Sequence, residues 1–460
     1  MRRPEIVEIL ERTQRGEYCS PKEWDTKRIP QAIREKLKKH RLEHTFTPLD
    51  PVNCDDSLAD AFYQAGFELA SELGMLCEST ERIVKVSEEE LVRSLEDAPS
   101  EIFVGEGEDG TWIRTRTPSD PVPMVFAASM GIMFDEELWP VITEAIMREP
   151  AVDLVEGPTL IQVYGRDVLA GTPFETLVGY VHARQNRELR EKVGRAGMGA
   201  VGVTSSTTEY GQLAGYGVPG GFRPSDLSLV LFPSEMKINY PVLHKVVHTL
   251  NNGGYVFAGS PAMIGGMPGP PEGAALSCIA CGLLIYPVLH ASSGGGEIYD
   301  VRHLTNVHRA GLWSLSVANQ ALSRNTHLLT HAIANEVSGP CTETLLLESL
   351  VGVATIAVSG VAIGAGPRPA GGKLKNYLTP LECRFCAEVA HAASGVSRQR
   401  VNEIAREILP RYENQIGDPD VGRPLNEAYD LETMRPTREW EALYRKVKDE
   451  AIQLGIPLGE

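Results

Sequence analysis

The sequence predicts an α/β fold, a TIM (β/α)8 barrel with an N-terminal helical layer and C-terminal helices. Three observations predict it. Short apolar or β-branched segments alternate with helical patterns across residues 101–410, no charged linker interrupts that stretch, and 460 residues provide enough chain for one large barrel. We expect a single structural unit in three parts: a helical layer at residues 1–100, the barrel at 101–410 and a helical extension at 411–460. A doubly wound arrangement of two domains is the less favoured alternative.

The first 100 residues follow helical patterns with clear start signals. Residues 20–23 and 87–90 have the S-x-x-E spacing of capping boxes, the first with proline at the opening helical position. Apolar residues recur at helical spacing in residues 59–76, which predicts an amphipathic helix.

The barrel region opens with a hairpin and continues as alternating strands and helices. Residues 102–104 and 112–115 are suited to strands and flank Glu108-Asp109-Gly110, which predicts the hairpin. The other expected strands are residues 123–128, 152–157, 198–204, 227–232, 255–259 and 361–364. The expected helices are residues 135–147, 173–193, 240–250, 274–290, 312–335, 342–358, one opening at the Thr379-Pro380-Leu381-Glu382 capping box, 398–412 and 436–454.

The composition argues against several classes of protein. With 44 Lys+Arg and 61 Asp+Glu the formal charge is −17, which argues against a nucleic-acid partner. Residues 273–291 and 349–366 are uncharged, but Pro287 interrupts the first and Ser and Gly dilute the second, so we expect buried barrel elements and no membrane partner. The charged first residues show no apolar targeting segment, and 8 cysteines are too sparse for a disulfide scaffold. We therefore expect a cytoplasmic protein.

Several motifs have structural interpretations that compete with functional ones. Residues 197–202 match G-x-G-x-x-G, but a helical pattern precedes them where the dinucleotide fingerprint needs a strand. The C-x-x-C pairs at 278–281 and 383–386 lie in expected helix interiors and fit buried thiols, with a zinc site as the alternative. Histidines spaced i,i+4 at 244–248 and 327–331 share a helix face if those segments are helical, but they lack the glutamate of a metalloprotease.

A polar cluster follows the glycine-rich residues 292–296. Polar residues after such a turn tend to lie at the mouth of a barrel, where substrates bind, although a salt-bridged surface loop explains them equally well. The members of the cluster are Glu297, Asp300, Arg302, His303, His308 and Arg309.

Five blocks of sequence resemble one enzyme family. Residues 194–202, Gly-Arg-Ala-Gly-Met-Gly-Ala-Val-Gly, are similar to the glycine-rich segment that carries pyrrolysine in monomethylamine:corrinoid protein methyltransferases. The resemblance extends from near residue 16 to beyond residue 400. Its other blocks are residues 16–19 with 24–25, 65–68 through 82–85, 235–238 and 339–343.

The resemblance implies a TIM-barrel enzyme that moves a methyl group from an amine to the Co(I) of a separate corrinoid protein. It also implies a homo-oligomer, a hexamer in the family. No tightly bound cofactor and no metal are expected, because the partner supplies the corrinoid (cobalamin). Since Co(I) is a strong nucleophile, the reaction is an in-line displacement in which the departing amine must be activated.

The chain departs from this family at its reactive position. Val201 stands where the resemblance places pyrrolysine, so the chain is a homologue lacking that residue. Neighbouring polar positions are replaced as well, by Gly259, Ile333, Asn335 and, for a second family glutamate, Ser228 or Leu229.

Without pyrrolysine, we hypothesise that the methyl donor is already activated. A quaternary ammonium compound is the simplest choice, because its fixed charge lets the amine leave neutral, and it favours aromatic faces and a carboxylate. The predicted catalytic residues are Glu209, Asp300 and His331. The predicted substrate-binding residues are Val201, Tyr210, Tyr255, Phe257, Arg302, Trp313 and Asn335, with Tyr216, Tyr299 and Glu336 as further candidates.

Three other functions remain as alternatives. The barrel could act as a binding protein that has lost catalysis, as a monomethylamine methyltransferase that works without pyrrolysine, or as a zinc-dependent hydrolase.

Overall fold

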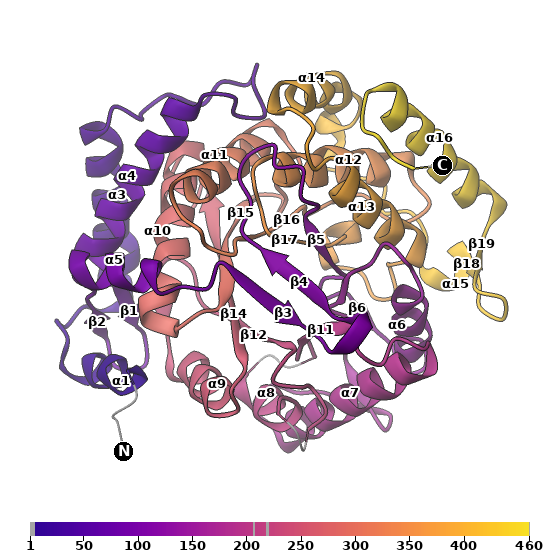
Figure 1. The fold of residues 1–460 in the computed structure, drawn as a ribbon, viewed down its shortest axis with the longest axis horizontal. Coiled ribbons are helices and arrows are strands. Elements are labelled where there is room, and N and C mark those ends of the chain that lie inside the picture. Colours follow the sequence, from indigo (N-terminus) through magenta and orange to yellow (C-terminus); the bar gives the residue numbers. More distant parts are fainter. Residues whose placement is uncertain (1–4, 206–207, 218–219, 460) are drawn as a thin grey trace.

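Eight parallel strands form a barrel at the centre of the molecule (Figure 1). The structure is a computed structural model that describes residues 5–205, 208–217 and 220–459. β17 pairs with β5, and a bridge between Gly294 and Thr330 joins β15 to the segment entering β16, so the ring closes and the predicted TIM barrel is confirmed. In chain order the strands are β5 (Val125–Ala128), β7 (Leu154–Val155), β11 (Gly199–Gly202), β12 (Leu227–Leu231), β14 (Tyr255–Ile264), β15 (Ser293–Asp300), β16 (His331–Ile333) and β17 (Ile363–Ala365).

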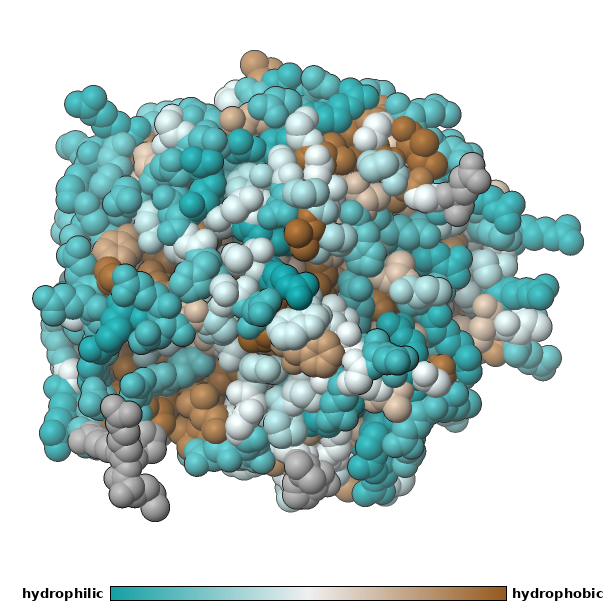
Figure 2. All heavy atoms as spheres, viewed as in Figure 1, coloured by the Kyte–Doolittle hydropathy of each residue, from teal (hydrophilic) through white to brown (hydrophobic). Residues whose placement is uncertain are grey.

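Helices follow every barrel strand and form the outer ring. The longest apolar one, α10, could span a membrane by length and composition, but its apolar window is fully buried. The face drawn in Figure 2 is mostly hydrophilic, with apolar side chains gathered in small areas. The helices of the ring are α6 (Trp139–Met147), α7 (Pro173–Lys192), α8 (Glu209–Gly215), α9 (Tyr240–Asn251), α10 (Pro271–Leu289), α11 (Arg309–Asn325), α12 (Glu343–Val358), α13 (Pro380–Ala392) and α14 (Arg398–Ile408).

The N-terminal residues cover one side of this ring. A Cβ at Gly66 of α4 would meet the Ile279 side chain of α10 at 2.4 Å, so the two helices pack closely there. The layer contains α1 (Ile6–Arg15), α2 (Pro21–Glu23), the π-helix η1 (Trp24–Arg28), α3 (Ile29–Lys39), α4 (Asp56–Leu73), α5 (Glu88–Glu96) and a small sheet of β1 (Met75–Cys77), β2 (Arg82–Val84) and β13 (Lys237–Ile238).

The predicted hairpin is confirmed and closes the amino-terminal end of the barrel. β3 (Glu101–Val104) pairs antiparallel with β4 (Thr111–Arg114). Ile102, Val104 and Ile113 pack in the same apolar cluster as the inward side chains of the barrel strands. The opposite end, where the strands finish, is not covered by this hairpin. That end is where the active site of a barrel enzyme is expected.

The remaining short elements lie in loops and in the C-terminal extension. They are β6 (Met133–Phe134), β8 (Thr159–Leu160), β9 (Gln162–Val163), β10 (Arg166–Asp167), α15 (Leu425–Ala428), β18 (Tyr429–Asp430), β19 (Arg435–Pro436), α16 (Arg438–Gln453) and the 3-10 turns η2 (Gly107–Asp109), η3 (Pro369–Gly372), η4 (Leu409–Arg411) and η5 (Glu413–Gln415).

Two predictions about the barrel are wrong. The helix expected to reach residue 335 ends at Asn325, and residues 331–333 form β16, so His327 and His331 do not share a helix face. The glycine-rich stretch expected as a flexible turn begins strand β15 at Ser293. A Cβ at Gly296 would meet the Cys278 side chain at 2.6 Å, so the glycine there serves close packing of β15 on α10.

The predicted helix starts are largely confirmed. Ser87 with Glu90, and Thr379 with Glu382, form reciprocal capping boxes. The Ser20 side chain accepts a hydrogen bond from the backbone N–H of Glu23. The helix expected over residues 59–76 ends earlier, at Leu73, because the chain turns there into strand β1.

Candidate functional site

The barrel interior presents an apolar floor centred on Val201. Side chains alternate along each strand, so every second residue points inward. Val201 on β11 is fully buried and belongs to one cluster with Leu227 on β12, Phe257 on β14, Tyr299 on β15 and Ile333 on β16. Leu229, Met130 and Met263 pack against this cluster.

Two buried carboxylates stand among these apolar side chains. Glu297 lies two residues before Tyr299 on β15, and the Tyr299 hydroxyl donates a hydrogen bond to its Oε2. Glu156 directly follows β7 and is 4% exposed. Burial, with a further contribution from the charge of Glu297, raises the pKa of Glu156 to about 8. Burial also raises the pKa of Glu297, whose Oε1 is buried without a hydrogen-bond partner in the described residues.

His331 adds unused hydrogen-bonding atoms to the same interior. Its ring centroid lies 4.7 Å from that of Phe257, with the rings edge to face. Neither ring nitrogen has a hydrogen-bond partner in the part of the chain that the structure describes. Burial lowers the pKa of His331 to about 3, so the imidazole is neutral and offers one donor and one acceptor.

Gly259 on β14 lies beside Glu297 in the barrel interior. A Cβ built on Gly259 of β14 would meet Leu231 Cδ2 at 3.5 Å and Glu297 Oε1 at 3.7 Å, which are ordinary contacts. The glycine is therefore not required by close packing. A methyl group at position 259 would contact the unpaired carboxylate oxygen of Glu297.

Polar groups from three strand ends form the rim above this interior. Arg368, which follows β17, donates from Nη1 to Asn335 Oδ1 at 3.3 Å, and Asn335 donates from Nδ2 to the carbonyl of Leu304. Glu336 accepts hydrogen bonds from the Arg368 backbone N–H at 2.8 Å and from Ser349 Oγ at 2.8 Å. These contacts hold the loops after β15, β16 and β17 together.

The structure places part of the predicted site in this region. Val201, Phe257 and His331 line the interior, and Asn335 lies buried at the rim. Tyr255 is half-buried at the first residue of β14, on the side closed by the hairpin and one inward position before Phe257.

Asp300 and Arg302 lie farther out on the rim, at the end of β15. The Asp300 carboxylate accepts a hydrogen bond from the backbone N–H of Arg302 at 2.8 Å. Arg302 is exposed and lines a groove of about 320 Å³ with Lys373 and Val337. Neither side chain belongs to the interior cluster.

The structure does not bring three predicted residues to the interior. Glu209 and Tyr210 open α8 in the outer ring, and Tyr210 is 44% exposed. Trp313 on α11 is 2% exposed because its ring packs edge-on against Phe46 and Phe62, at centroid distances of 5.5 and 5.9 Å. The prediction of a substrate contact for Trp313 is therefore corrected to a packing role between α11 and the N-terminal layer.

Glu156 and Arg368 were not among the predicted site residues, and Glu297 was named only as a member of the polar cluster after residues 292–296. A signal existed for two of them: Glu156 ends an apolar strand pattern, and Glu297 is spaced by two residues from Tyr299, which puts both on one strand face. Nothing in the sequence near Arg368 points to the barrel interior. Its position depends on how the loops after β16 and β17 pack.

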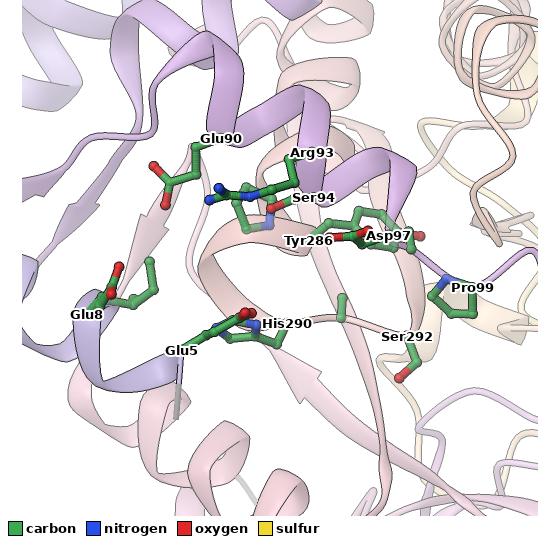
Figure 3. A pocket seen from close by; sticks show the side chains of 14 residues that line it. Glu5, Glu8, Glu90, Arg93, Ser94, Asp97, Pro99, Tyr286, His290 and Ser292 are labelled. Atoms are coloured by element: carbon green, nitrogen blue, oxygen red, sulfur yellow. The ribbon is translucent and has the colours of Figure 1, made fainter. Parts of the chain in front are cut away.

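Other candidate features lie outside this region. In the described ranges no group of three or more His, Cys, Asp or Glu side chains is arranged to hold a metal ion, and the two C-x-x-C pairs are buried free cysteines on α10 and α13. A pocket of about 580 Å³ lies between α1, α5 and the end of α10 (Figure 3), where Glu8, Glu90 and His290 line it. It contains Ser292, just before β15 begins, so it is at the amino-terminal side of the barrel.

Comparison with known proteins gives consistent matches over nearly the whole chain. A family model described as monomethylamine methyltransferase MtmB matches residues 5–456. Monomethylamine methyltransferase MtmB of Methanosarcina mazei and MtmB1 of Methanosarcina acetivorans are each 27% identical over 455 residues, covering 98% of both chains. The crystal structure of the Methanosarcina barkeri monomethylamine methyltransferase (MtmB) is similar with a TM-score of 0.93 and 26% identity, over 99% of this chain and 100% of that one.

Proposed function

Because the chain belongs to the monomethylamine methyltransferase MtmB family, we propose that it transfers a methyl group from a quaternary ammonium compound to a corrinoid carried by a separate protein. Corrinoid-dependent methyl transfer from a methylated amine follows from the family. The quaternary donor, the corrinoid's attachment to a partner, a homo-oligomeric state and a cytoplasmic location are the parts that we propose.

One observation supports the quaternary donor most directly: two carboxylates are buried among apolar and aromatic side chains around Val201. Burying a carboxylate is costly, which is why the pKa of Glu156 is raised to about 8 although the charge of Arg368 opposes the shift. A bound organic cation would add further opposite charge, while its methyl groups would contact Phe257 and Tyr299. A compound that is both cationic and apolar fits this lining.

Glu297 offers a replacement for the acidic residue missing at position 259. In the family resemblance a glutamate stands at the position of Gly259, and the Glu297 Oε1 atom is 3.7 Å from where a Cβ on Gly259 would lie. A carboxylate thus reaches that part of the interior from the neighbouring strand. This supports a site that still binds a cationic donor although several family residues have changed.

Residues of the chain would bind the donor and orient its methyl group. Glu156 and Glu297 would hold the cationic nitrogen, and the flat Val201 floor would leave a methyl group facing the opening at the strand ends. When bound there, Co(I) supplies the nucleophile that receives the methyl group. This role is supported by the polar atoms of Glu297 and His331 that have no hydrogen-bond partner in the described residues. The hairpin leaves uncovered the end at which the strands finish.

The proposal is tested by cobalt methylation with the purified chain and a Co(I) corrinoid protein, followed by the visible absorbance of cobalt. We expect methylation from tetramethylammonium or choline, and a loss of about tenfold or more in kcat/KM for Glu297→Gln, since a charge-assisted contact is worth about 1.5–3 kcal/mol. Glu89→Gln, at an exposed position of α5, serves as the matched control. Methylation from monomethylamine but from no quaternary amine would overturn the proposal. Binding of amines by calorimetry without any methylation would support a binding protein instead.

A further inference from the structure

Arg368 is a half-buried arginine at the rim, and most of its hydrogen-bond donors are unused. Its guanidinium makes one hydrogen bond to a side chain, from Nη1 to Asn335 Oδ1 at 3.3 Å. It forms no ion pair with a carboxylate of the described residues. Arg116, in contrast, donates from Nε, Nη1 and Nη2 to the carbonyls of Val122, Val361 and Asp120 and is 2% exposed.

The position of Arg368 connects it to the carboxylates of the interior. Its positive charge lowers the pKa of both Glu156 and Glu297, against the larger effect of burial. Arg368 is half-buried at the rim, at the carboxyl-terminal side of β17. Asn335 and the backbone contact to Glu336 fix the start of its loop.

Negative and positive side chains therefore both border the barrel interior. Two carboxylates lie among apolar side chains in the interior, and a guanidinium with free donors lies at the rim. A purely cationic donor would gain from the carboxylates but would be repelled by Arg368. A cationic donor that also carries an anionic group on a short chain would pair with the carboxylates and with Arg368, because a planar guanidinium pairs well with a carboxylate.

We propose that Arg368 is a specificity-determining residue that selects zwitterionic donors, in which a quaternary ammonium group carries a carboxylate. This inference rests on the proposed function and narrows its substrate class. The ammonium group is bound between Glu156, Glu297 and the aromatic rings, and the carboxylate is bound at the rim by the Arg368 guanidinium.

Calorimetry with three compounds of nearly equal size tests recognition of the cation and recognition of the carboxylate separately. N,N,N-Trimethylglycine carries both charges, choline carries only the cation, and 3,3-dimethylbutanoate carries only the carboxylate. We expect native protein to bind trimethylglycine at least about tenfold more tightly than choline, as a charge-assisted hydrogen bond of about 1.5–3 kcal/mol requires. Arg368→Met should remove that preference, because trimethylglycine loses the partner of its carboxylate and choline has no carboxylate to pair.

Two further variants keep the result interpretable. Lys373→Met removes a charge from an exposed residue of the same loop and should change neither affinity. Arg368→Lys keeps the charge without the planar fork and should retain part of the preference. Thermal unfolding of each variant establishes that it is folded.

The outcomes separate this inference from the proposed function. If trimethylglycine binds native protein no better than choline, or if both weaken equally in Arg368→Met, the role of Arg368 is overturned while a quaternary donor still stands. If 3,3-dimethylbutanoate binds as tightly as trimethylglycine, cation recognition in the interior is overturned.

Discussion

At the scale of single residues, the chemistry of the site depends on carboxyl groups held where water does not reach them. Glu156 and Glu297 have raised pKa values because burial penalises their charged forms. A charged carboxylate in such a place attracts a cation more strongly than an exposed one, because the local dielectric response is weaker. Because burial raises the pKa of these carboxyl groups, cation binding depends on pH.

We therefore predict that cation binding strengthens as pH rises through the pKa of Glu156, which is about 8. Between about pH 7 and pH 9 the ionised fraction rises by up to about tenfold, so the Kd of tetramethylammonium should fall by a similar factor. Isothermal calorimetry across this range measures it. In Glu156→Gln the dependence should become weaker, with Glu297 as the remaining titrating carboxyl group, and an unchanged dependence in that variant would assign the titration to another group.

At the scale of elements, packing partners decide which aromatic residues can meet a ligand. Phe257 and Trp313 were both predicted to bind substrate. Phe257 belongs to a barrel strand and points inward, whereas Trp313 lies on the outer helix α11 and contacts Phe46 and Phe62 of the N-terminal layer. The aromatic ring of Trp313 therefore attaches the outer helix to the N-terminal layer.

This placement predicts that changes at Trp313 alter stability and not ligand affinity. Trp313→Ala should lower the free energy of unfolding by about 3–5 kcal/mol, since it leaves a large cavity between α4 and α11. Trp313→Phe should lower it by less, and this folded variant should bind tetramethylammonium as the native protein does. Chemical denaturation and calorimetry measure the two quantities. A weaker affinity for tetramethylammonium in Trp313→Phe, with unchanged stability, would indicate that Trp313 contacts the ligand.

At the scale of the whole molecule, buried carboxyl groups also tie barrel loops to the outer helices. Glu348 on α12 accepts hydrogen bonds from the backbone N–H groups of Val337 and Ser338, and Glu382 caps α13. Burial raises the pKa of Glu336 to about 7 and the pKa values of Glu348 and Glu382 to about 8.

These shifts predict that the protein is more stable near pH 5 than near pH 9. The folded state keeps protons that the unfolded chain releases above its ordinary carboxyl pKa of about 4.3, so the free energy of unfolding falls as pH rises from there to about 8. Thermal unfolding across this range measures the effect. Glu382→Gln can keep the capping contact to Thr379 while removing one titrating group, so it should flatten the profile. An equally steep profile in this variant would contradict the assignment to Glu382.

The sequence alone determined the barrel, its closing hairpin, and helix starts such as those at Ser87 and Thr379. These features depend on local spacing, because strand–helix alternation and caps involve residues close together in the chain. β16 was missed because a strand of three residues buried on both faces is a short apolar run that looks like the end of the preceding helix.

Only the tertiary structure decided which residues meet in the barrel interior. Glu156, Glu297 and Arg368 are far apart in the sequence, and no periodicity relates them. They converge because all eight parallel strands of a closed barrel finish at the same end, so side chains at or just after strand ends face one opening. The sequence could place Val201 in a glycine-rich segment, but ring closure determined that buried carboxylates and aromatic rings surround it.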